Sequence, residues 1–259
     1  MTVLSEIAYA QARIQSRYGQ RAGASVWLKL HNINDLGSYL QSAQQSPLRH
    51  WVLGLSSNHS SHEIELTLRQ KYRHHVDEVA NWMPMEWKHN LQWIKRLVDL
   101  PVINYLVNGG EPLQWMKSDP YLSGFTADDP AMRQLALRQA GSRIMLEHWS
   151  RSGSILTGWL AQWYSLLPRG AQRDRGMVAL EALLNEQMQL QSRQQPAVAP
   201  ADYETIFERL RLIFRHNAFQ PAAVYAYLAI VALDLHRIRS DLMQRLYFRP
   251  VQAIAQDLP

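Results

Sequence analysis

The sequence contains no cysteine, and this absence excludes several classes of protein. A chain without thiols has no disulfide framework, no thiolate metal site and no cysteine nucleophile, which fits a reducing compartment. Its most apolar run, residues 222–233, has twelve residues, whereas a bilayer span needs roughly 20. Residues 1–15 show no basic segment followed by an apolar run. We therefore expect a cytoplasmic protein with no signal sequence and no direct membrane span.

The common motifs of catalysis are missing as well. The sequence has no Gly-x-Ser-x-Gly, no Gly-x4-Gly-Lys phosphate loop and no Gly-x-Gly-x-x-Gly. Glu147 and His148 are adjacent, and neighbours on a helix point about 100° apart, so they do not act as an acid/base pair. We assign no catalytic residue, no metal ligand and no cofactor, and we predict that the protein is not an enzyme.

A formal net charge of +5 raises the question of nucleic acid. Arg133, Arg138 and Arg143 recur at steps of five, and each step turns about 140° around a helix. The basic side chains therefore scatter around the helix, and no zinc-finger, RNP-type or basic-zipper pattern is present. We expect a dispersed basic surface that keeps the protein soluble or attracts an acidic partner, and no nucleic-acid binding.

The strongest helical pattern lies near the end of the chain, where six apolar residues recur at steps of four and three and so share one helix face. These residues are Val224, Leu228, Val231, Leu235, Ile238 and Leu242. Pro221 suits the first turn, and the apolar first half predicts burial on several sides. In the second half, Asp234, Arg237, Asp241 and Arg245 are three or four apart and predict a solvated, salt-bridged flank.

Capping and breaking signals predict the other helices. Asp35, Ser46 before Pro47, Ser60 with Glu63 as a capping box, Asp129 before Pro130, and Asp202 mark helix starts. The helix after Ser60 turns Ile64, Leu68, Tyr72, Val76 and Val79 inward. Gly141, Gly153 and Gly158 are expected to divide or bend the long helical region.

No series of alternating strands appears, so we predict an all-α fold. The expected arrangement is a multi-helix globular body or a funnel-like array of small helical units. We predict an N-terminal helical region over residues 1–110, a connector over 111–129 and a C-terminal helical region over 130–259, or one continuous body. Residues 192–201 form the one flexible linker that the composition predicts.

One set of residues occurs twice in the same order, and this internal echo fits small repeated units. Asp35-Leu36, Tyr39-Leu40, Pro47-Leu48 and Trp51 recur in order as Asp99-Leu100, Tyr105-Leu106, Pro112-Leu113 and Trp115. A degenerate helical repeat and chance both remain open as explanations.

Two groups of residues are candidates for ligand binding. One, which includes His74 and Glu78 on a single helix face, offers metal-ligand chemistry, although a solvated face is the favoured interpretation. The remaining members of that group are His59, His62, Glu63, Glu65 and His75. Trp159 and Trp163 are four apart and stack on one helix face, which favours core or interface packing and leaves a flat ligand or partner surface as the alternative. Nine tryptophans favour an interaction protein.

Both ends of the chain resemble the family that includes the d subunits of eukaryotic V-ATPases and the C subunits of archaeal and bacterial V/A-type ATPases. The run Phe219-x-Pro221-x-x-Val224-Tyr225-Ala226-Tyr227-Leu228, followed by Leu235-x-x-Ile238-Arg239, is similar to the C-terminal signature of that family. Tyr9-Ala-Gln-Ala-Arg13 resembles a motif of its first helix, and His62-Glu-Ile-Glu65 with Leu68 resembles a helix opening. In this chain Ala232-Leu233-Asp234 replaces the acidic, Lys-Glu-rich element of the family.

The resemblance implies a non-catalytic coupling protein built from helical units. Members of the family sit on a membrane-embedded rotor ring, hold the central stalk and serve proton transport without chemistry of their own. By this resemblance the chain is a helical adaptor with protein partners, a ring or stalk protein among them, placed peripherally on the inner face of a membrane. The matched positions are Tyr9, Arg13, Tyr225, Tyr227 and Arg239, and their favoured role is structural. The alternative hypothesis is an aromatic-lined helical module that binds a small ligand or metal.

Overall fold

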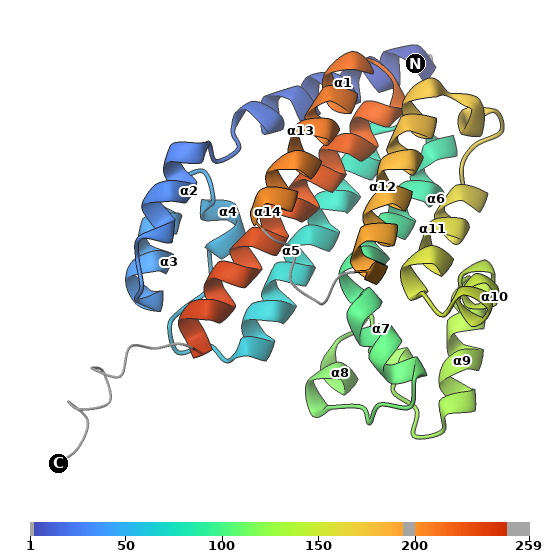
Figure 1. The fold of residues 1–259 in the computed structure, drawn as a ribbon, viewed down its shortest axis with the longest axis horizontal. Coiled ribbons are helices and arrows are strands. Elements are labelled where there is room, and N and C mark those ends of the chain that lie inside the picture. The colour runs from blue at the N-terminus through green and yellow to red at the C-terminus, as the bar shows by residue number, and fades with distance from the viewer. Residues whose placement is uncertain (1–2, 194–199, 248–259) are drawn as a thin grey trace.

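The structure, a computed structural model, describes residues 3–193 and 200–247, and every regular element in these ranges is a helix (Figure 1). The predicted all-α fold is therefore confirmed. The α-helices are α1 (Val3–Gly19), α2 (Ala24–His31), α3 (Leu36–Gln44), α4 (Arg49–Val52), α5 (Ser61–Trp82), α6 (Met85–Ile94), α7 (Leu100–Val107), α8 (Gln114–Ser118), α9 (Pro130–Gln139), α10 (Arg143–Ser152), α11 (Ile155–Ser165), α12 (Arg175–Arg193), α13 (Pro200–His216) and α14 (Pro221–Tyr247). Short 3₁₀ helices lie between them at η1 (Lys95–Asp99), η2 (Ser123–Phe125) and η3 (Ala171–Arg173).

Helix α14 is the centre of the fold. It packs against α1, α3, α5, α12 and α13 and crosses the middle of the body (Figure 1). All six residues of its predicted stripe are buried, and so is every residue from 222 to 228. The apolar first half is thus covered on several sides, as its composition predicts. Burying one large aliphatic side chain stabilises the fold by about 1.5–3 kcal/mol. The buried stripe of α14 therefore contributes substantially to the free energy of folding.

Most of the predicted helix starts are confirmed by hydrogen bonds or by position. Asp35 accepts from a backbone N–H of the first turn of α3 at 2.7 Å. Ser60 and Glu63 form the reciprocal capping box at the start of α5. Asp129 accepts from the backbone at the start of α9 at 2.8 Å, and Pro221 is the first residue of α14. These caps satisfy N–H groups that have no partner within the helix.

Three local features differ from the prediction. Helix α2 was not predicted, because Gly23 precedes it and offers no side-chain cap. Ser46 does not begin a helix at Pro47: its hydroxyl donates to the Ala43 carbonyl at 2.8 Å and accepts from the Leu48 N–H at 3.1 Å, so it joins the end of α3 to the short α4. Helix α13 begins at Pro200, so Asp202 lies inside the helix and not at the predicted N-cap position.

The predicted linker over residues 192–201 overlaps both neighbouring helices, because α12 reaches Arg193 and α13 begins at Pro200. The rest of that segment, residues 194–199, lies outside the described residues.

The glycines of the C-terminal half act in two ways. Gly141 and Gly153 adopt positive φ values of 80° and 70° and separate α9, α10 and α11, as predicted. Gly158 was expected to divide or bend the helix, but it lies within α11. A Cβ atom there would stand 2.2 Å from the carbonyl oxygen of Met145. The glycine therefore allows α10 and α11 to pack with backbones in close approach.

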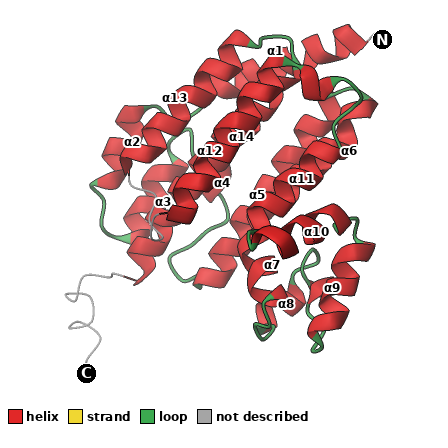
Figure 2. Ribbon diagram, turned by 45° about the vertical axis from the view of Figure 1, so that its right-hand side comes forward, coloured by secondary structure: helices red, strands yellow, loops and turns green. Residues whose placement is uncertain are grey.

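Helices α7, α8, α9 and α10 form a smaller group at one side of the body (Figure 2). The predicted connector over residues 111–129 holds α8 and η2, which agrees with the expectation of short helical turns. One continuous apolar cluster of buried residues runs from Ala10 to Leu242, so the predicted N-terminal and C-terminal regions share a core.

The two halves of the internal echo occupy different environments. Tyr39 is fully buried while Tyr105 is 44% exposed, and Leu48 is buried while Leu113 is 45% exposed. The structure therefore does not support equivalent roles for these anchors.

The flank of α14 differs from the solvated, salt-bridged surface that the spacing predicts. Asp234 is buried and pairs with Arg21, beyond the end of α1, at 2.6 Å. Arg245 is also buried and donates to the carbonyl of Ile33 at 2.6 Å, while its pairing with Asp241 at 3.5 Å agrees with the prediction. Sequence spacing predicts only contacts between residues of the same helix. Here Arg21 and Ile33, which lie outside α14, contact this flank and help to cover it.

Helix α14 is also the one described helix that is long and apolar enough to cross a membrane by length and composition. Buried residues make up 67% of its most apolar window. Core helices of soluble proteins pass the same test, so this feature is weak evidence for a span.

Candidate functional site

An apolar cavity of about 260 Å³ lies between α11, α12, α13 and α14, and residues from α5, α6 and η1 also line it. Among the described residues, its lining consists of leucine, isoleucine, alanine, tryptophan and tyrosine, and none of these lining side chains is formally charged. Helix α14 contributes the small residues Ala229 and Ala232 to the lining, and the facing helices contribute large side chains. Such an apolar, partly enclosed space is typical of a small-molecule site.

Trp159 and Trp163 form one wall of this cavity. Their ring centroids are 6.5 Å apart and their planes differ by 5°, which confirms the predicted stacking on one face of α11. The two residues are only 4% and 1% exposed. They therefore belong to the core and the cavity wall and do not form an exposed partner surface.

Buried polar side chains from α6 hold α11 in place. The Asn90 side chain donates to the Trp163 carbonyl at 2.6 Å, and the Trp93 indole N–H donates to the Trp159 carbonyl at 3.2 Å. Tyr225 on α14 donates its hydroxyl hydrogen to the Asn90 side-chain oxygen. This chain of hydrogen bonds links three helices around the cavity, and sequence reasoning did not identify Asn90 as a part of it.

Three polar groups of the cavity-lining residues have no hydrogen-bond partner among the described residues: the hydroxyl of Tyr72 and the indole N–H groups of Trp159 and Trp163. Burial raises the pKa of Tyr72, so its hydroxyl stays neutral. The apolar periodicity of α5 predicts that Tyr72 points inward, but it gives no sign that the hydroxyl lacks a partner. Buried polar groups without partners are rare in folded proteins.

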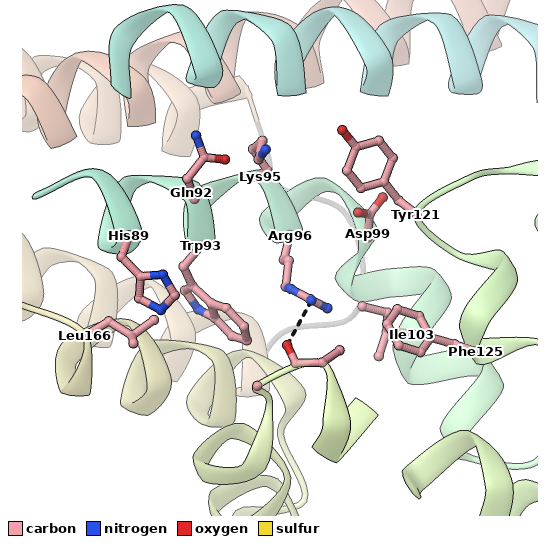
Figure 3. Close-up of a pocket in the computed structure, with 12 residues that line it drawn as sticks. His89, Gln92, Trp93, Lys95, Arg96, Asp99, Ile103, Tyr121, Phe125 and Leu166 are labelled. Carbon is pink, nitrogen blue, oxygen red and sulfur yellow. Dashed lines mark hydrogen bonds between the residues drawn. The ribbon is translucent and has the colours of Figure 1, made fainter. Parts of the chain in front are cut away.

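A second cavity, of about 290 Å³, lies beside α6 and η1 and reaches the turn between α9 and α10 (Figure 3). Its lysine and arginine side chains contact partners within the chain. Lys95 pairs with Asp77 at 2.9 Å, and Arg96 donates to the Ala140 carbonyl at 3.1 Å, the dashed line of Figure 3. These two charged side chains therefore hold helices together, and helix packing explains why they lie in this cavity.

At the edge of the second cavity lies a buried ionic cluster. Arg73 on α5 pairs with Asp99 and lies 3.5 Å from the nearest Asp119 oxygen. Its guanidinium also stands 4.1 Å from the ring centroid of Tyr121. Burial raises the pKa of Asp99, while Arg73 acts in the opposite direction. The cluster joins α5 to η1 and to the segment after α8.

The two tyrosines that carry the family resemblance are buried and join helices that are distant in sequence. Tyr225 contacts Asn90 as described, and the Tyr227 hydroxyl lies 2.9 Å from the Nε2 atom of His75 on α5. Both contacts cross from α14 to helices of the N-terminal half.

The other three matched positions lie nearer the surface. Arg239 pairs with Glu65 on α5. Arg13 donates to the Tyr9 hydroxyl at 2.6 Å, and its guanidinium stands 5.0 Å from the ring centroid of Trp82. All five positions therefore make contacts within the chain.

The histidines and carboxylates considered for metal binding do not converge. His74 is 79% exposed and lies 3.8 Å from Glu78, as their spacing predicts. His75 is instead buried, so the favoured interpretation of a solvated helix face is wrong for this residue, and burial lowers its pKa to about 3. Within residues 3–193 and 200–247, no group of three or more such side chains could hold a metal ion.

Fold and site together define an all-α protein with a cavity whose described lining is apolar and aromatic. Compared with known proteins, the chain matches no family model, no curated protein and no solved structure. The resemblance to V/A-type ATPase subunits therefore rests on the short motifs alone and stays a prediction.

Proposed function

We propose that this protein is a non-catalytic helical adaptor that docks on a membrane-associated complex, in the manner of the coupling subunits of V/A-type ATPases. The observation that carries the proposal is an exposed apolar end of the body. Leu4, Met85 and Phe219 are 77%, 80% and 63% exposed. They belong to the start of α1, the α5–α6 junction and the α13–α14 junction, which lie at the same end of the molecule (Figure 1). Exposed apolar surface of this kind is typical of protein contacts.

The contacts of the matched positions support the same proposal. Tyr225, Tyr227 and Arg239 fix α14 against α5 and α6, so the residues of the signature maintain the body that presents this end. A coupling protein transmits force, and a continuous core with buried polar cross-links suits a rigid body. The charges of the ionic cluster around Arg73 are likewise used within the chain.

Site-specific photo-crosslinking tests the proposal. A benzophenone amino acid is placed at Leu4, Met85 or Phe219, the variant is expressed in its native cell, and products from isolated membranes are identified by mass spectrometry. We expect each position to crosslink to a ring or stalk protein of a membrane ATPase. Leu28, which is 65% exposed on α2, is the matched control and should give no such product.

A second measurement gives the contribution of the apolar end to binding. Glutamate at Leu4, Met85 and Phe219 together should weaken co-sedimentation with the purified complex at least tenfold, because charged side chains are unfavourable at the centre of an interface. Circular dichroism checks that the fold is unchanged. If the protein stays a free monomer and gives no ring or stalk product at any position, the adaptor proposal is wrong.

A further inference from the structure

We propose that Phe219 is the anchor of the exposed apolar end, and that it inserts into an apolar pocket of a protein partner whose rim is acidic. The inference rests on the adaptor proposal, because it names the residue of that end which dominates binding and the chemistry of the surface that receives it. Three observations support it: the backbone conformation of Phe219, the exposure of its side chain and the charges beside it.

The backbone conformation of Phe219 is unfavourable for a residue with a side chain. Its φ is +65°, and it is the one residue other than glycine with a positive φ within residues 3–193 and 200–247. Phe219 is the third residue of a turn in which the Gln220 N–H donates to the Asn217 carbonyl at 3.0 Å. A positive φ at this position normally selects glycine or asparagine, because a bulky side chain crowds the backbone there. Phenylalanine therefore destabilises the turn.

Packing within the protein does not offset this strain. Phe219 is 63% exposed, and its neighbours Ala218 and Gln220 are exposed as well, so the ring buries little apolar surface. Residues held in strained backbone conformations cluster at functional sites, where the strain serves a contact. The positive φ and the exposed ring together indicate a contact with another molecule.

Hydrogen bonds on both sides of the turn hold the ring in position. The backbone N–H of Asn217 donates to the Ile213 carbonyl at 3.1 Å, and the Asn217 side-chain amide donates to the same carbonyl at 2.8 Å. At the start of α14 the Ala223 N–H donates to the Gln220 carbonyl at 3.1 Å. A preorganised aromatic side chain loses little conformational entropy on binding, and aromatic anchors that fill pockets dominate many interfaces. Because the phenylalanine ring has no polar atom, the pocket that fits it is apolar.

Cationic side chains flank the same turn. Arg215 is exposed in the last turn of α13, and Arg175 is exposed at the start of α12. The start of α12 lies against the turn, since a Cβ atom on Gly176 would stand 2.3 Å from the Asn217 Oδ1 atom. The nearby carboxylate of Asp174 accepts from a backbone N–H of the first turn of α12 at 3.0 Å. A partner with acidic side chains around its pocket complements these arginines.

The stability of the free protein gives a readout that needs no partner. Phe219→Asn should raise the melting temperature by about 2–4 °C, because asparagine tolerates a positive φ better than phenylalanine does. Phe219→Ala removes the ring but keeps a Cβ atom, so its melting temperature should stay unchanged. Thermal unfolding followed by circular dichroism measures both variants. If Phe219→Asn does not raise the melting temperature, the residue is not strained and the inference is overturned.

Co-sedimentation with the purified membrane ATPase complex of the native cell tests the anchor itself. Phe219→Ala should weaken binding about tenfold or more, as expected for an interface hot spot. Leu4→Ala and Met85→Ala are the matched controls, because both residues are exposed at the same end, and each should weaken binding by less than about threefold. If the wild type does not bind, the adaptor proposal and this inference are both wrong. If the wild type and Phe219→Ala bind equally well, the adaptor proposal stands and this inference is overturned.

Charge reversal tests the acidic rim. Arg175→Glu combined with Arg215→Glu should weaken binding about tenfold at low ionic strength and make binding less dependent on salt. Arg138→Glu combined with Arg151→Glu reverses two exposed charges on α9 and α10, and this control should bind like the wild type. Equal losses in the two double variants would overturn the acidic rim.

Vesicles test a lipid surface as the other occupant of this end. The wild type and Phe219→Ala are each sedimented with protein-free vesicles of phosphatidylcholine and phosphatidylserine. We expect no binding that depends on Phe219. If the wild type binds these vesicles and Phe219→Ala does not, the ring inserts into lipid, and the protein pocket is overturned.

Discussion

Arg21 and Asp234 are 213 residues apart in the sequence and form a two-point ion pair with N–O distances of 2.6 and 2.7 Å. The Tyr203 hydroxyl of α13 donates to the same carboxylate at 3.0 Å. The side chains of Arg21 and Asp234 are 14% and 6% exposed. This contact ties the segment after α1 to the middle of the central helix and to α13, where the spacing of charges along α14 predicts only a solvated flank.

Breaking this pair should destabilise the protein. Asp234→Ala leaves the Arg21 guanidinium largely buried without its carboxylate, and we expect the free energy of unfolding to fall by about 3–5 kcal/mol. Urea denaturation measures the change. Replacing Arg21 by methionine and Asp234 by leucine together should recover most of the loss, because no unpaired charge remains. Glu147→Ala, in an exposed pair with Arg143, is the control and should leave the midpoint unchanged. A midpoint that does not move in Asp234→Ala contradicts the prediction.

His75 should make stability depend on pH. Burial, with Arg17, His50 and His74 as nearby positive groups, lowers its pKa from 6.5 to about 3 in the folded protein. Below pH 6.5 the unfolded chain therefore binds a proton that the folded chain does not, so stability falls as the pH falls towards 3. One such group changes the free energy of unfolding by about 1.4 kcal/mol per pH unit, or about 2 kcal/mol between pH 6.5 and pH 5.

Urea denaturation at pH 7, 6 and 5 measures this slope. His75→Gln keeps a polar partner for the Tyr227 hydroxyl and removes the titrating group, so its slope should be smaller by that amount. The exposed His74 provides the comparison: His74→Gln should retain the wild-type slope. Equal slopes in wild type and His75→Gln would show that His75 is not the responsible group.

Gly158→Ala should destabilise the packing of α10 on α11. The new Cβ atom would stand 2.2 Å from the Met145 carbonyl oxygen, so the two helices must separate. Forcing extra volume into a packed contact typically costs about 1–3 kcal/mol. Thermal unfolding measures the loss. Gly19→Ala is the matched control, because nothing lies within 4 Å of the added methyl group; a loss of the same size there would refute the explanation by close packing.

The ionic cluster of Arg73 should stabilise the segment after α8 locally. Arg73→Met leaves Asp99 and Asp119 buried without their cation, and removing one partner of such a cluster typically costs about 3–5 kcal/mol. Relative to the wild type, Arg73→Met should therefore increase the rate of hydrogen exchange more at residues 114–125 than in α14. Uniform protection across both regions would contradict a local role. Lys117→Met, on the exposed surface of α8, is the control.

The all-α fold and most helix starts followed from the sequence because their causes are local. Periodicity at steps of three and four placed the stripe of α14 in the core, and the side chains of Asp35, Ser60 and Asp129 cap helices within a few residues of themselves. Helix α2 was missed because it begins after Gly23, which gives no capping signal.

The candidate site was predictable only in part. The spacing of Trp159 and Trp163 predicted their stacking, since both lie on one helix. Nothing local indicated that Tyr72 and the small residues of α14 would meet them across a cavity, or that Asn90 would hold α11. Those contacts depend on how helices far apart in sequence cross one another.

The sequence by itself thus determined which segments are helices and which of their faces turn inward, because hydrogen bonding within a helix and the burial of an apolar stripe depend on residues a few positions apart. Only the tertiary structure decided the partners of the polar side chains. Asp234 pairs with Arg21, the Tyr227 hydroxyl contacts His75, and the buried donors of Tyr72, Trp159 and Trp163 have no partner among the described residues. Such outcomes depend on which helices pack together, and no spacing along a single helix specifies that.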